Sequence, residues 1–195
     1  MRILLPQPIE KEAIQLIQEA GIEIVLSPDP KPETVQPLMR GVQGIILRTG
    51  IKMTRELISH GDDLWVISRT GAGVDNVDVP AATEMGILVT CVPAANTNSV
   101  VEHTLALILA LVKQLPLMDR EVREDHFHIR YKNIPRDLSV KTLGVLGLGR
   151  IGSEVARICR SAFGMRILGY DPYLTPEAKI SLEKWIEFCE MERLF

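Results

Sequence analysis

LGVLGLGRIG, residues 143–152, is the stretch of sequence that decides the fold. Its apolar run leads into Gly147, Gly149 and Gly152, which match the pattern G-x-G-x-x-G. In this pattern the first glycine allows a tight turn, the second lets a cofactor approach the backbone, and the third lets a helix pack on its strand. The first N–H groups of such a helix can bind a pyrophosphate. The stretch therefore predicts a strand, a glycine-rich turn and a helix that bind a dinucleotide.

An acidic residue follows the next predicted strand, MRILGY, residues 165–170. Asp171 stands about 20 residues after Gly152, the spacing at which a carboxylate binds the ribose hydroxyls of NAD. The same carboxylate would repel the 2′-phosphate of NADP, so NAD is the expected cofactor. Arg150, inside the motif, is compatible with two roles: it braces the pyrophosphate, or it is a solvated helix residue. A glycine-rich turn that binds no ligand is the alternative for the whole stretch.

Composition and charge narrow the class of protein. The chain has 195 residues, of which 46% are hydrophobic and 24% charged, as in ordinary globular proteins. A net charge of −3 gives no basic field for nucleic acid. The longest apolar run, residues 105–112, is too short to cross a bilayer, and no signal-peptide pattern is present. We therefore expect a cytoplasmic protein that binds neither nucleic acid nor membrane, with Cys91, Cys159 and Cys189 as buried, reduced thiols.

Strands and helices alternate before the glycine-rich stretch. The predicted strands are Arg2–Leu5, Glu23–Leu26, Gly44–Leu47, Leu64–Ser68 and Ile87–Thr90. Between the first two, apolar residues recur at helical spacing from Ile9 to Ala20, and Gly21 supplies a left-handed stop. Such alternation predicts a parallel sheet with helices on both faces. We expect residues 1–95 to form one α/β domain.

A connecting helix and a charged segment are predicted for residues 96–141. The helix is expected to begin at Ser99, where Glu102 completes a capping box, and to run to Pro116. It is apolar nearly all round, so we expect it to be buried between domains. Residues 117–139 are charged and are expected to form an irregular surface arm.

A second domain is expected to begin at about residue 142 and to be incomplete. A complete dinucleotide fold has two βαβαβ halves, and residues 142–195 hold only the start of the first. The last segment predicts a helix with one apolar face, formed by Leu182, Trp185, Ile186 and Cys189. The chain is thus expected to be truncated.

Three linked motifs resemble the D-isomer-specific 2-hydroxyacid dehydrogenase family, and most closely its D-3-phosphoglycerate dehydrogenase branch. SRTGAGVDNVDVPAATEMGILVT (68–90) is similar to the family's substrate loop, PAANTNSVVEHTLALILAL (93–111) to its interdomain helix, and KTLGVLGLGRIG (141–152) with YDP (170–172) to its cofactor site. The resemblance implies an α/β fold: an incomplete flavodoxin-like substrate domain, then the first part of a Rossmann NAD-binding domain.

The resemblance also implies substrate contacts in the first domain. Backbone N–H groups at Gly73 and Val74 would hold the substrate carboxylate in an anion nest, and Asn96 would lie in the cleft or start the interdomain helix. Arg48 and Arg69 each follow a predicted strand, at the carboxyl end where ligands bind in open α/β sheets. Matching arginines in phosphoglycerate dehydrogenases lie near the substrate phosphate. Surface salt bridges are the alternative for both arginines.

Further residues of the same motifs have expected roles. Those expected to bind the cofactor are Thr104, Gly147, Gly149, Arg150, Ile151, Gly152 and Asp171. Helix packing is the alternative for Thr104. Asp75 and Asn76 are expected to shape their loop by bonding to their own backbone. Ala72 stands where the family often has a hydroxyl-bearing residue, so one contact to the nicotinamide end would be missing.

The chemistry that the resemblance implies is hydride transfer between C2 of a D-2-hydroxy acid and NAD. The favoured substrate is D-3-phosphoglycerate, which would give 3-phosphohydroxypyruvate in serine biosynthesis. The family's histidine, glutamate and arginine are expected beyond Phe195, so this chain contains no catalytic residue and should show no turnover alone. The alternatives are an NAD-sensing regulator that keeps the fold, and an inactive truncated remnant.

Two further expectations concern metals and assembly. No metal site is expected, because no carboxylate or cysteine stands at convincing ligand spacing from His126 and His128. The sheet edge that an incomplete second domain would expose is a template for pairing. The charged arm corresponds to one that reaches a partner subunit in the family. We therefore expect a homodimer or a larger homo-oligomer.

Overall fold

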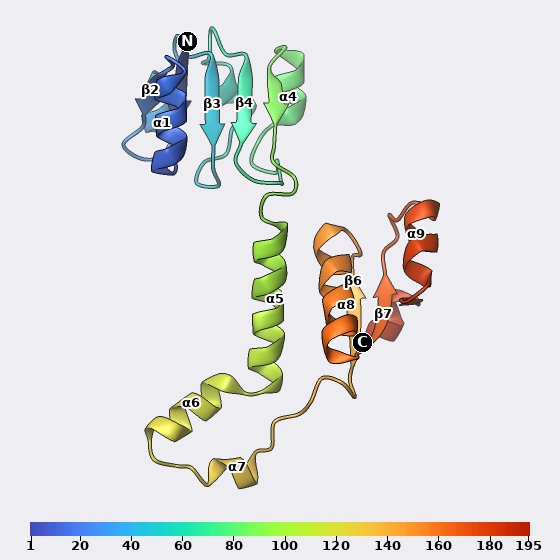
Figure 1. Cartoon of the computed structure of the whole chain (residues 1–195). Coiled ribbons are helices and arrows are strands. Elements are labelled where there is room, and N and C mark those ends of the chain that lie inside the picture. The colour runs from blue at the N-terminus through green and yellow to red at the C-terminus, as the bar shows by residue number, and fades with distance from the viewer. The chain divides into compact units, whose positions relative to one another are not determined.

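The computed structural model describes residues 1–195, which form two units. The N-terminal unit comprises Met1–Asn96 and is built on a five-stranded sheet. Its strands are β1 (Arg2–Leu5), β2 (Glu23–Leu26), β3 (Gly44–Leu47), β4 (Val66–Arg69) and β5 (Leu88–Thr90) (Figure 1). They lie in the order β2-β1-β3-β4-β5, and all neighbouring pairs are parallel. The expected parallel α/β class is confirmed, with β4 beginning two residues later than predicted and including Arg69.

Short helices connect these strands. They are α1 (Lys11–Glu19), α2 (Pro32–Val35), the 3-10 turn η1 (Gln36–Leu38), α3 (Arg55–Ile58) and α4 (Val79–Glu84). The side chains of Thr54 and Asp78 cap α3 and α4 by accepting backbone N–H bonds. Gly21 has φ of 71°, which is the left-handed stop expected after α1.

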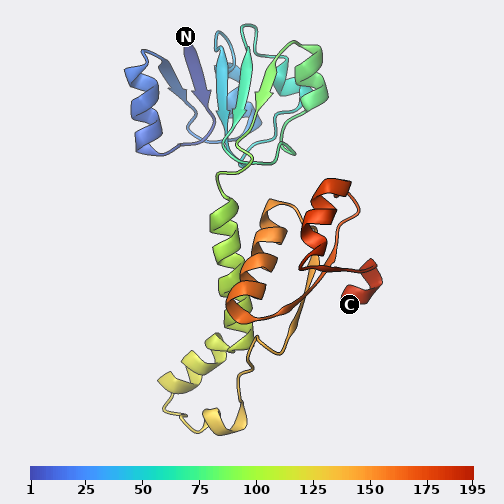
Figure 2. The same cartoon turned by 45° about the vertical axis from the view of Figure 1, so that its right-hand side comes forward.

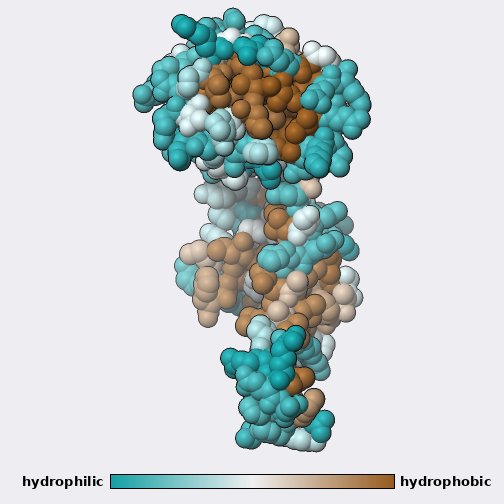
Figure 3. All heavy atoms as spheres, turned by 90° about the vertical axis from the view of Figure 1, so that its left-hand side faces the viewer, coloured by the Kyte–Doolittle hydropathy of each residue, from teal (hydrophilic) through white to brown (hydrophobic).

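One face of this sheet carries the core of the unit. Leu4, Ile45 and Ile67 point into it and are at most 1% exposed. Successive residues point to opposite faces of a strand, so Ile3, Ile46 and Val66 belong to the other face, where they are only half-buried. Helix α1 has no buried residue and covers little of that face. Figure 3 shows a broad hydrophobic area on this unit, surrounded by hydrophilic residues.

The C-terminal unit comprises Thr97–Phe195 and contains a three-stranded parallel sheet. Its elements are α5 (Thr97–Val112), α6 (Leu115–Arg123), α7 (Ile129–Lys132), β6 (Thr142–Leu146), α8 (Arg150–Phe163), β7 (Arg166–Tyr170), α9 (Pro176–Glu183), β8 (Glu187–Phe188) and η2 (Met191–Leu194) (Figure 2). The strands lie in the order β6-β7-β8. The core combines Val145 and Ile167 of the sheet with Val155 and Cys159 of α8 and Val101 of α5.

The predictions for α5 are wrong in three respects. The helix begins at Thr97, so Ser99 lies inside it and no capping box forms there. It ends at Val112, and Pro116 lies instead in the first turn of α6. Only one stripe of the helix surface packs against α8, so Leu111 is 78% exposed although the helix is apolar nearly all round.

No single helix is long and apolar enough to span a membrane. Helices α5 and α6, bent by 57° at their junction, reach the required length and composition only together, which is weak evidence for a span.

Other local predictions for the C-terminal unit are also wrong. Residues 117–139 are not irregular, because most of α6 and all of α7 lie within them. The final segment is not one helix: α9 ends at Glu183, and residues 187–188 pair with β7 as a third strand, which satisfies backbone groups at that edge. Cys91 is exposed and only Cys159 is buried, where burial raises the pKa of its thiol.

Candidate functional site

A pocket lies at the carboxyl ends of β3 and β4. The two strands are adjacent and parallel, with Leu47 opposite Arg69, so the segments that follow them emerge side by side. The pocket has a volume of about 350 Å³ and is lined by Arg48, Thr49, Arg69, Thr70, Gly71, Ala72, Gly73, Asp75 and Asn96. Among the predicted substrate residues, the structure thus brings Arg48, Arg69, Gly73 and Asn96 together. Val74 belongs to the same loop but does not line the pocket.

The guanidinium group of Arg69 is fixed at one edge of this pocket. Its Nε donates a hydrogen bond to Oδ1 of Asn76 at 3.2 Å. Its Nη1 lies against Gly71, where the Cβ of any larger residue would collide with it. Arg69 is half-buried and forms no ion pair with a carboxylate. The surface-salt-bridge alternative therefore does not describe Arg69.

Arg48 is held differently. Its Nη1 donates to the backbone oxygen of Pro8 at 2.9 Å and lies 3.7 Å from a carboxylate oxygen of Glu10. Its side chain is 45% exposed. The alternative of a surface salt bridge thus describes Arg48 in part, since its charge is shared with an acidic neighbour outside the pocket.

The loop residues Asp75 and Asn76 do not act as expected from turn chemistry. The Asn76 amide bonds to distant segments, donating to the backbone oxygens of Arg48 at 2.8 Å and Ile51 at 3.0 Å. The Asp75 carboxylate folds over Gly73, with Oδ1 at 2.7 Å from the position that a Cβ would occupy there. The pocket therefore contains two cationic side chains and one anionic side chain.

The glycine-rich loop of the C-terminal unit is a tight turn between β6 and α8. Gly147 has φ of 89°, a conformation that side chains disfavour, and its N–H donates to the backbone oxygen of Tyr170 at 2.8 Å. A Cβ at Gly152 would collide with the carbonyl oxygen of Gly147. A Cβ at Gly149, in contrast, would meet no atom within 4 Å. The fold thus requires glycine at two of the three positions and leaves open space at the third.

Asp171 connects this loop to the end of β7. Its Oδ2 accepts the backbone N–H of Leu148 at 2.8 Å, and its Oδ1 accepts that of Tyr173 at 2.8 Å. A carboxylate has about four lone-pair sites, so both oxygens can still accept a bond from a ribose hydroxyl. The sequence pattern indicated the ligand role of Asp171 but not this second role, which is to hold the glycine-rich loop.

The remaining predicted cofactor residues belong to helices of the same unit. Arg150 is the first residue of α8, after Gly149 as its N-cap, and Ile151 is 37% exposed. Thr104 is half-buried on α5, and its hydroxyl donates to the backbone oxygen of Val100 at 2.7 Å. This bond is the ordinary helix arrangement that was the alternative for Thr104.

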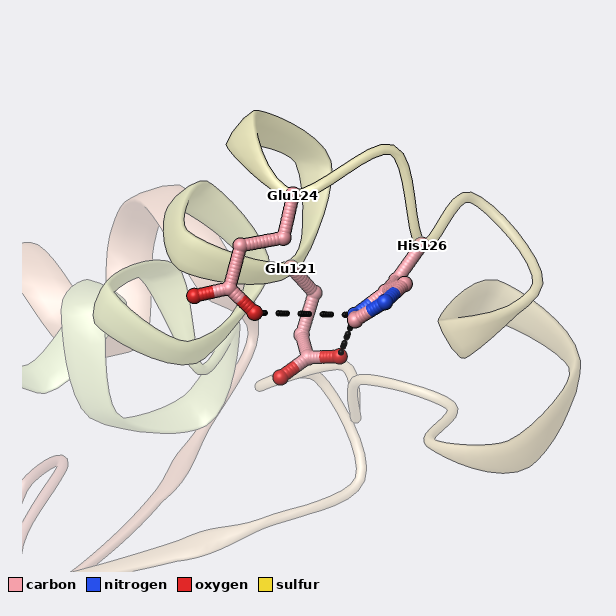
Figure 4. Close-up of side chains that lie close together, drawn as sticks. All are labelled: Glu121, Glu124 and His126. Atoms are coloured by element: carbon pink, nitrogen blue, oxygen red, sulfur yellow. Dashed lines mark hydrogen bonds and ion pairs between the residues drawn. The ribbon is translucent and has the colours of Figure 1, made fainter.

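A cluster that the sequence pattern did not reveal lies at the end of α6 (Figure 4). Nδ1 of His126 lies 3.2 Å from a carboxylate oxygen of Glu121 and 3.6 Å from one of Glu124. The chain reverses at Asp125, which has φ of 59°, and this turn returns His126 to the helix. The expectation that no carboxylate stands at convincing ligand spacing from His126 is therefore wrong, because the ligand atoms of Glu121, Glu124 and His126 lie within 4.8 Å of one another. The contacts of His126 with the two glutamates account for this arrangement, and we assign no metal to it.

Comparison with known proteins places this chain in a family. The family model described as D-isomer specific 2-hydroxyacid dehydrogenase, catalytic domain, matches residues 3–185. A D-3-phosphoglycerate dehydrogenase from Archaeoglobus fulgidus is 38% identical over 177 residues, which are 91% of this chain and 33% of that protein. The D-3-phosphoglycerate dehydrogenase of Homo sapiens is 36% identical over 180 residues, with 92% and 33% covered. The chain thus spans about a third of the length of these relatives.

Solved structures agree with this placement. A D-lactate dehydrogenase from Aquifex aeolicus, complexed with NAD and lactic acid, matches with a TM-score of 0.85 and 32% identity, covering 100% of this chain and 57% of that one. An NAD-dependent formate dehydrogenase from Staphylococcus aureus, in complex with NAD, matches with a TM-score of 0.81 and 29% identity, covering 100% and 62%. The resemblance found in the sequence motifs is therefore confirmed, and the chain belongs to the D-isomer-specific 2-hydroxyacid dehydrogenase family.

Proposed function

We propose that this chain supplies the substrate pocket and the cofactor loop of an NAD-dependent D-2-hydroxyacid dehydrogenase. The observation that carries the proposal is the joining of the glycine-rich loop, residues 147–152, to the carboxylate of Asp171. A tight glycine turn before a helix, with an acid after the next strand, has the arrangement that binds NAD in Rossmann folds. The relatives named for hydroxyacid and formate dehydrogenation support the same cofactor.

The reaction that we propose is the oxidation of a D-2-hydroxy acid to a 2-oxo acid. NAD would supply the hydride acceptor for the hydrogen on C2 of the substrate. Backbone N–H groups of the loop and of the first turn of α8 would bind the pyrophosphate, and Asp171 would bind the ribose. We expect Gly73 and Val74 to hold the substrate carboxylate, with Asn96 as a further substrate contact. Thr104 would contact the nicotinamide side of the cofactor. No residue of this chain is proposed as the acid or base, and we expect no turnover from the chain alone.

The substrate that we propose is D-3-phosphoglycerate. Its phosphate and carboxylate suit a pocket with two arginines, because guanidinium groups bind both anions bidentately. The names of the relatives from Archaeoglobus fulgidus and Homo sapiens favour the same substrate. D-lactate would leave the charge of Arg69 without a phosphate partner.

We also propose that the chain forms a homodimer through its C-terminal unit. Large apolar side chains of α5, α6 and the segment after them are exposed, among them Leu107, Leu111, Phe127, Tyr131 and Ile134. A set of exposed apolar side chains of this size is typical of a protein–protein interface.

Calorimetric titration tests the substrate assignment. D-3-phosphoglycerate should bind the 195-residue chain at least about tenfold more tightly than D-lactate, because charge-assisted bonds to a phosphate add affinity. Arg69→Ala should remove this difference in affinity. Arg160→Ala should leave it unchanged, because Arg160 is an exposed residue of α8, in the other unit, that donates to the backbone oxygen of Trp185. Equal binding of the two acids by the wild-type chain would refute D-3-phosphoglycerate as the substrate.

A further inference from the structure

The Asn76 side chain joins three segments of the N-terminal unit. Its Oδ1 accepts from Nε of Arg69 at 3.2 Å, and its Nδ2 donates to the backbone oxygens of Arg48 at 2.8 Å and Ile51 at 3.0 Å. A side-chain amide offers two donor hydrogens, and both are used here. The main chain at Asn76 is fixed as well, because its carbonyl accepts from the N–H of Met53 at 2.8 Å. The amide is therefore held firmly beside the pocket.

The two arginines of the pocket depend on this amide in different ways. Arg69 donates a hydrogen bond directly to the amide oxygen of Asn76. Arg48 is held through its main chain, because its backbone oxygen accepts a hydrogen bond from the Asn76 amide. Arg48 lies 3.7 Å from Glu10, while Arg69 is half-buried without an ion pair. A partly desolvated cation without a carboxylate partner is costly unless an anion binds to it. Arg69 is thus the pocket's more available anion-binding group.

We propose that Asn76 is a positioning residue that orients Arg69 for an anionic substrate group. By accepting from Nε, it leaves the two terminal nitrogens of the guanidinium for a phosphate or carboxylate. Nη1 then lies against Gly71, in the lining of the pocket. This inference rests on the proposed function, since it takes the pocket as the substrate site.

The amide is better suited to this role than a carboxylate. Aspartate at position 76 could still accept from Nε of Arg69, but it could not donate to the two carbonyl oxygens. It would also place a second negative charge beside Asp75 and pair with the cation that should bind the substrate. Position 76 thus requires both an acceptor without charge and two donors.

Hydrogen exchange at Nε–H of Arg69, measured by NMR on the ligand-free chain, tests the proposal directly. Arg69→Lys removes this signal and so identifies it. Asn76→Ala lacks all three bonds and should exchange roughly tenfold faster than the wild type, as for the loss of one hydrogen bond to a charged group. Asn76→Asp keeps the acceptor and should stay protected.

The two variants separate positioning from a merely structural role. Both lose the two backbone bonds, so a residue that only held the backbone would affect exchange in both alike. Rapid exchange in the wild type, or an unchanged rate in Asn76→Ala, would overturn the proposal. If Asn76→Ala does not fold, the Asp variant decides, because rapid exchange there contradicts the assigned contact.

Binding provides the second arm, with D-3-phosphoglycerate and inorganic phosphate as probes. Asn76→Ala and Arg69→Lys should each weaken binding roughly tenfold. Asn133→Ala is the matched control, because its amide bonds to Gln114 in the other unit. Unchanged affinity in Asn76→Ala, despite faster exchange, would overturn the positioning role. Absence of phosphoglycerate binding in the wild type would refute the proposed substrate, while the exchange rates would still decide the contact between Asn76 and Arg69.

Discussion

Alanine at Gly149 or at Gly152 should distinguish a glycine that a ligand requires from one that the fold requires. A Cβ at Gly152 would collide with the backbone oxygen of Gly147, which cannot move aside as a flexible side chain could. Overpacking of this kind costs about 1–3 kcal/mol. In a unit of this size, 1 kcal/mol corresponds to roughly 4–8 °C in Tm. Gly152→Ala should therefore lower the Tm of the chain by about 4–24 °C.

Gly149→Ala should behave in the opposite way. Gly149 has φ of −70°, which any residue adopts, and a Cβ there would meet no atom within 4 Å. Loss of an N-cap glycine and the reduced entropy of the unfolded chain oppose each other, so stability should change by less than about 1 kcal/mol. NADH affinity should nevertheless fall at least about tenfold, because the cofactor would pass where the methyl group lies.

Thermal unfolding and NADH fluorescence titration measure these two effects in the same samples. Both variants should be compared with Gly164→Ala, which alters a left-handed glycine at the other end of α8, where φ is 68°. This control variant should have a lower Tm, while its folded form should bind NADH as tightly as the wild type. A folded Gly149→Ala chain that binds NADH as tightly as the wild type would refute the placement of the cofactor at this loop.

Three further predictions concern the two pocket arginines, the exposed apolar side chains of the C-terminal unit, and the ion pair of Arg55 with Glu84 in the N-terminal unit. Arg69→Ala should weaken D-3-phosphoglycerate binding more than Arg48→Ala, because Arg48 already lies near Glu10; equal losses in calorimetry would contradict this ranking. Sedimentation at micromolar concentration should give at least twice the chain mass of 21.8 kDa, and Leu111→Glu should shift it towards the monomer; a folded wild-type monomer would refute the dimer. The hydrogen bond that Arg55 donates to Glu84, at 2.7 Å, lowers the pKa of Glu84. The stabilising contribution of this pair should therefore be present at neutral pH and disappear as the pH falls through that lowered pKa. NMR titration of Arg55→Gln should show the pKa of Glu84 rising back towards its ordinary value, and an unchanged pKa would contradict the assigned cause.

The sequence predicts this fold well where one pattern has one structural meaning. Alternating apolar runs and glycine stops predicted all five strands of the N-terminal unit to within two residues. The glycine-rich stretch predicted β6, α8 and β7, because the turn at Gly147 and the close contact at Gly152 leave few alternatives. Local spacing decides such features, so no knowledge of distant contacts is needed.

The predictions that are wrong depend on contacts between distant segments. The apolar surface of α5 suggested burial all round, but within its unit the helix packs mainly against α8, and Leu111 remains exposed. The apolar spacing after Leu182 predicted a continued helix, but Glu187 and Phe188 instead form a strand that pairs with β7. Asn76 was expected to bond locally, yet its partners are Arg48, Ile51 and Arg69, which only the folded sheet brings near.

The most direct test of the central claim is a competition between NADH and NADPH for the wild-type chain and its Asp171→Ala variant. The wild type should bind NADH at least about tenfold more tightly than NADPH, because a carboxylate accepts bonds from the ribose and repels a 2′-phosphate. The variant should lose most of this preference. Equal or tighter binding of NADPH by the wild type, or an unchanged preference in Asp171→Ala, would contradict an NAD site formed by the glycine-rich loop and Asp171.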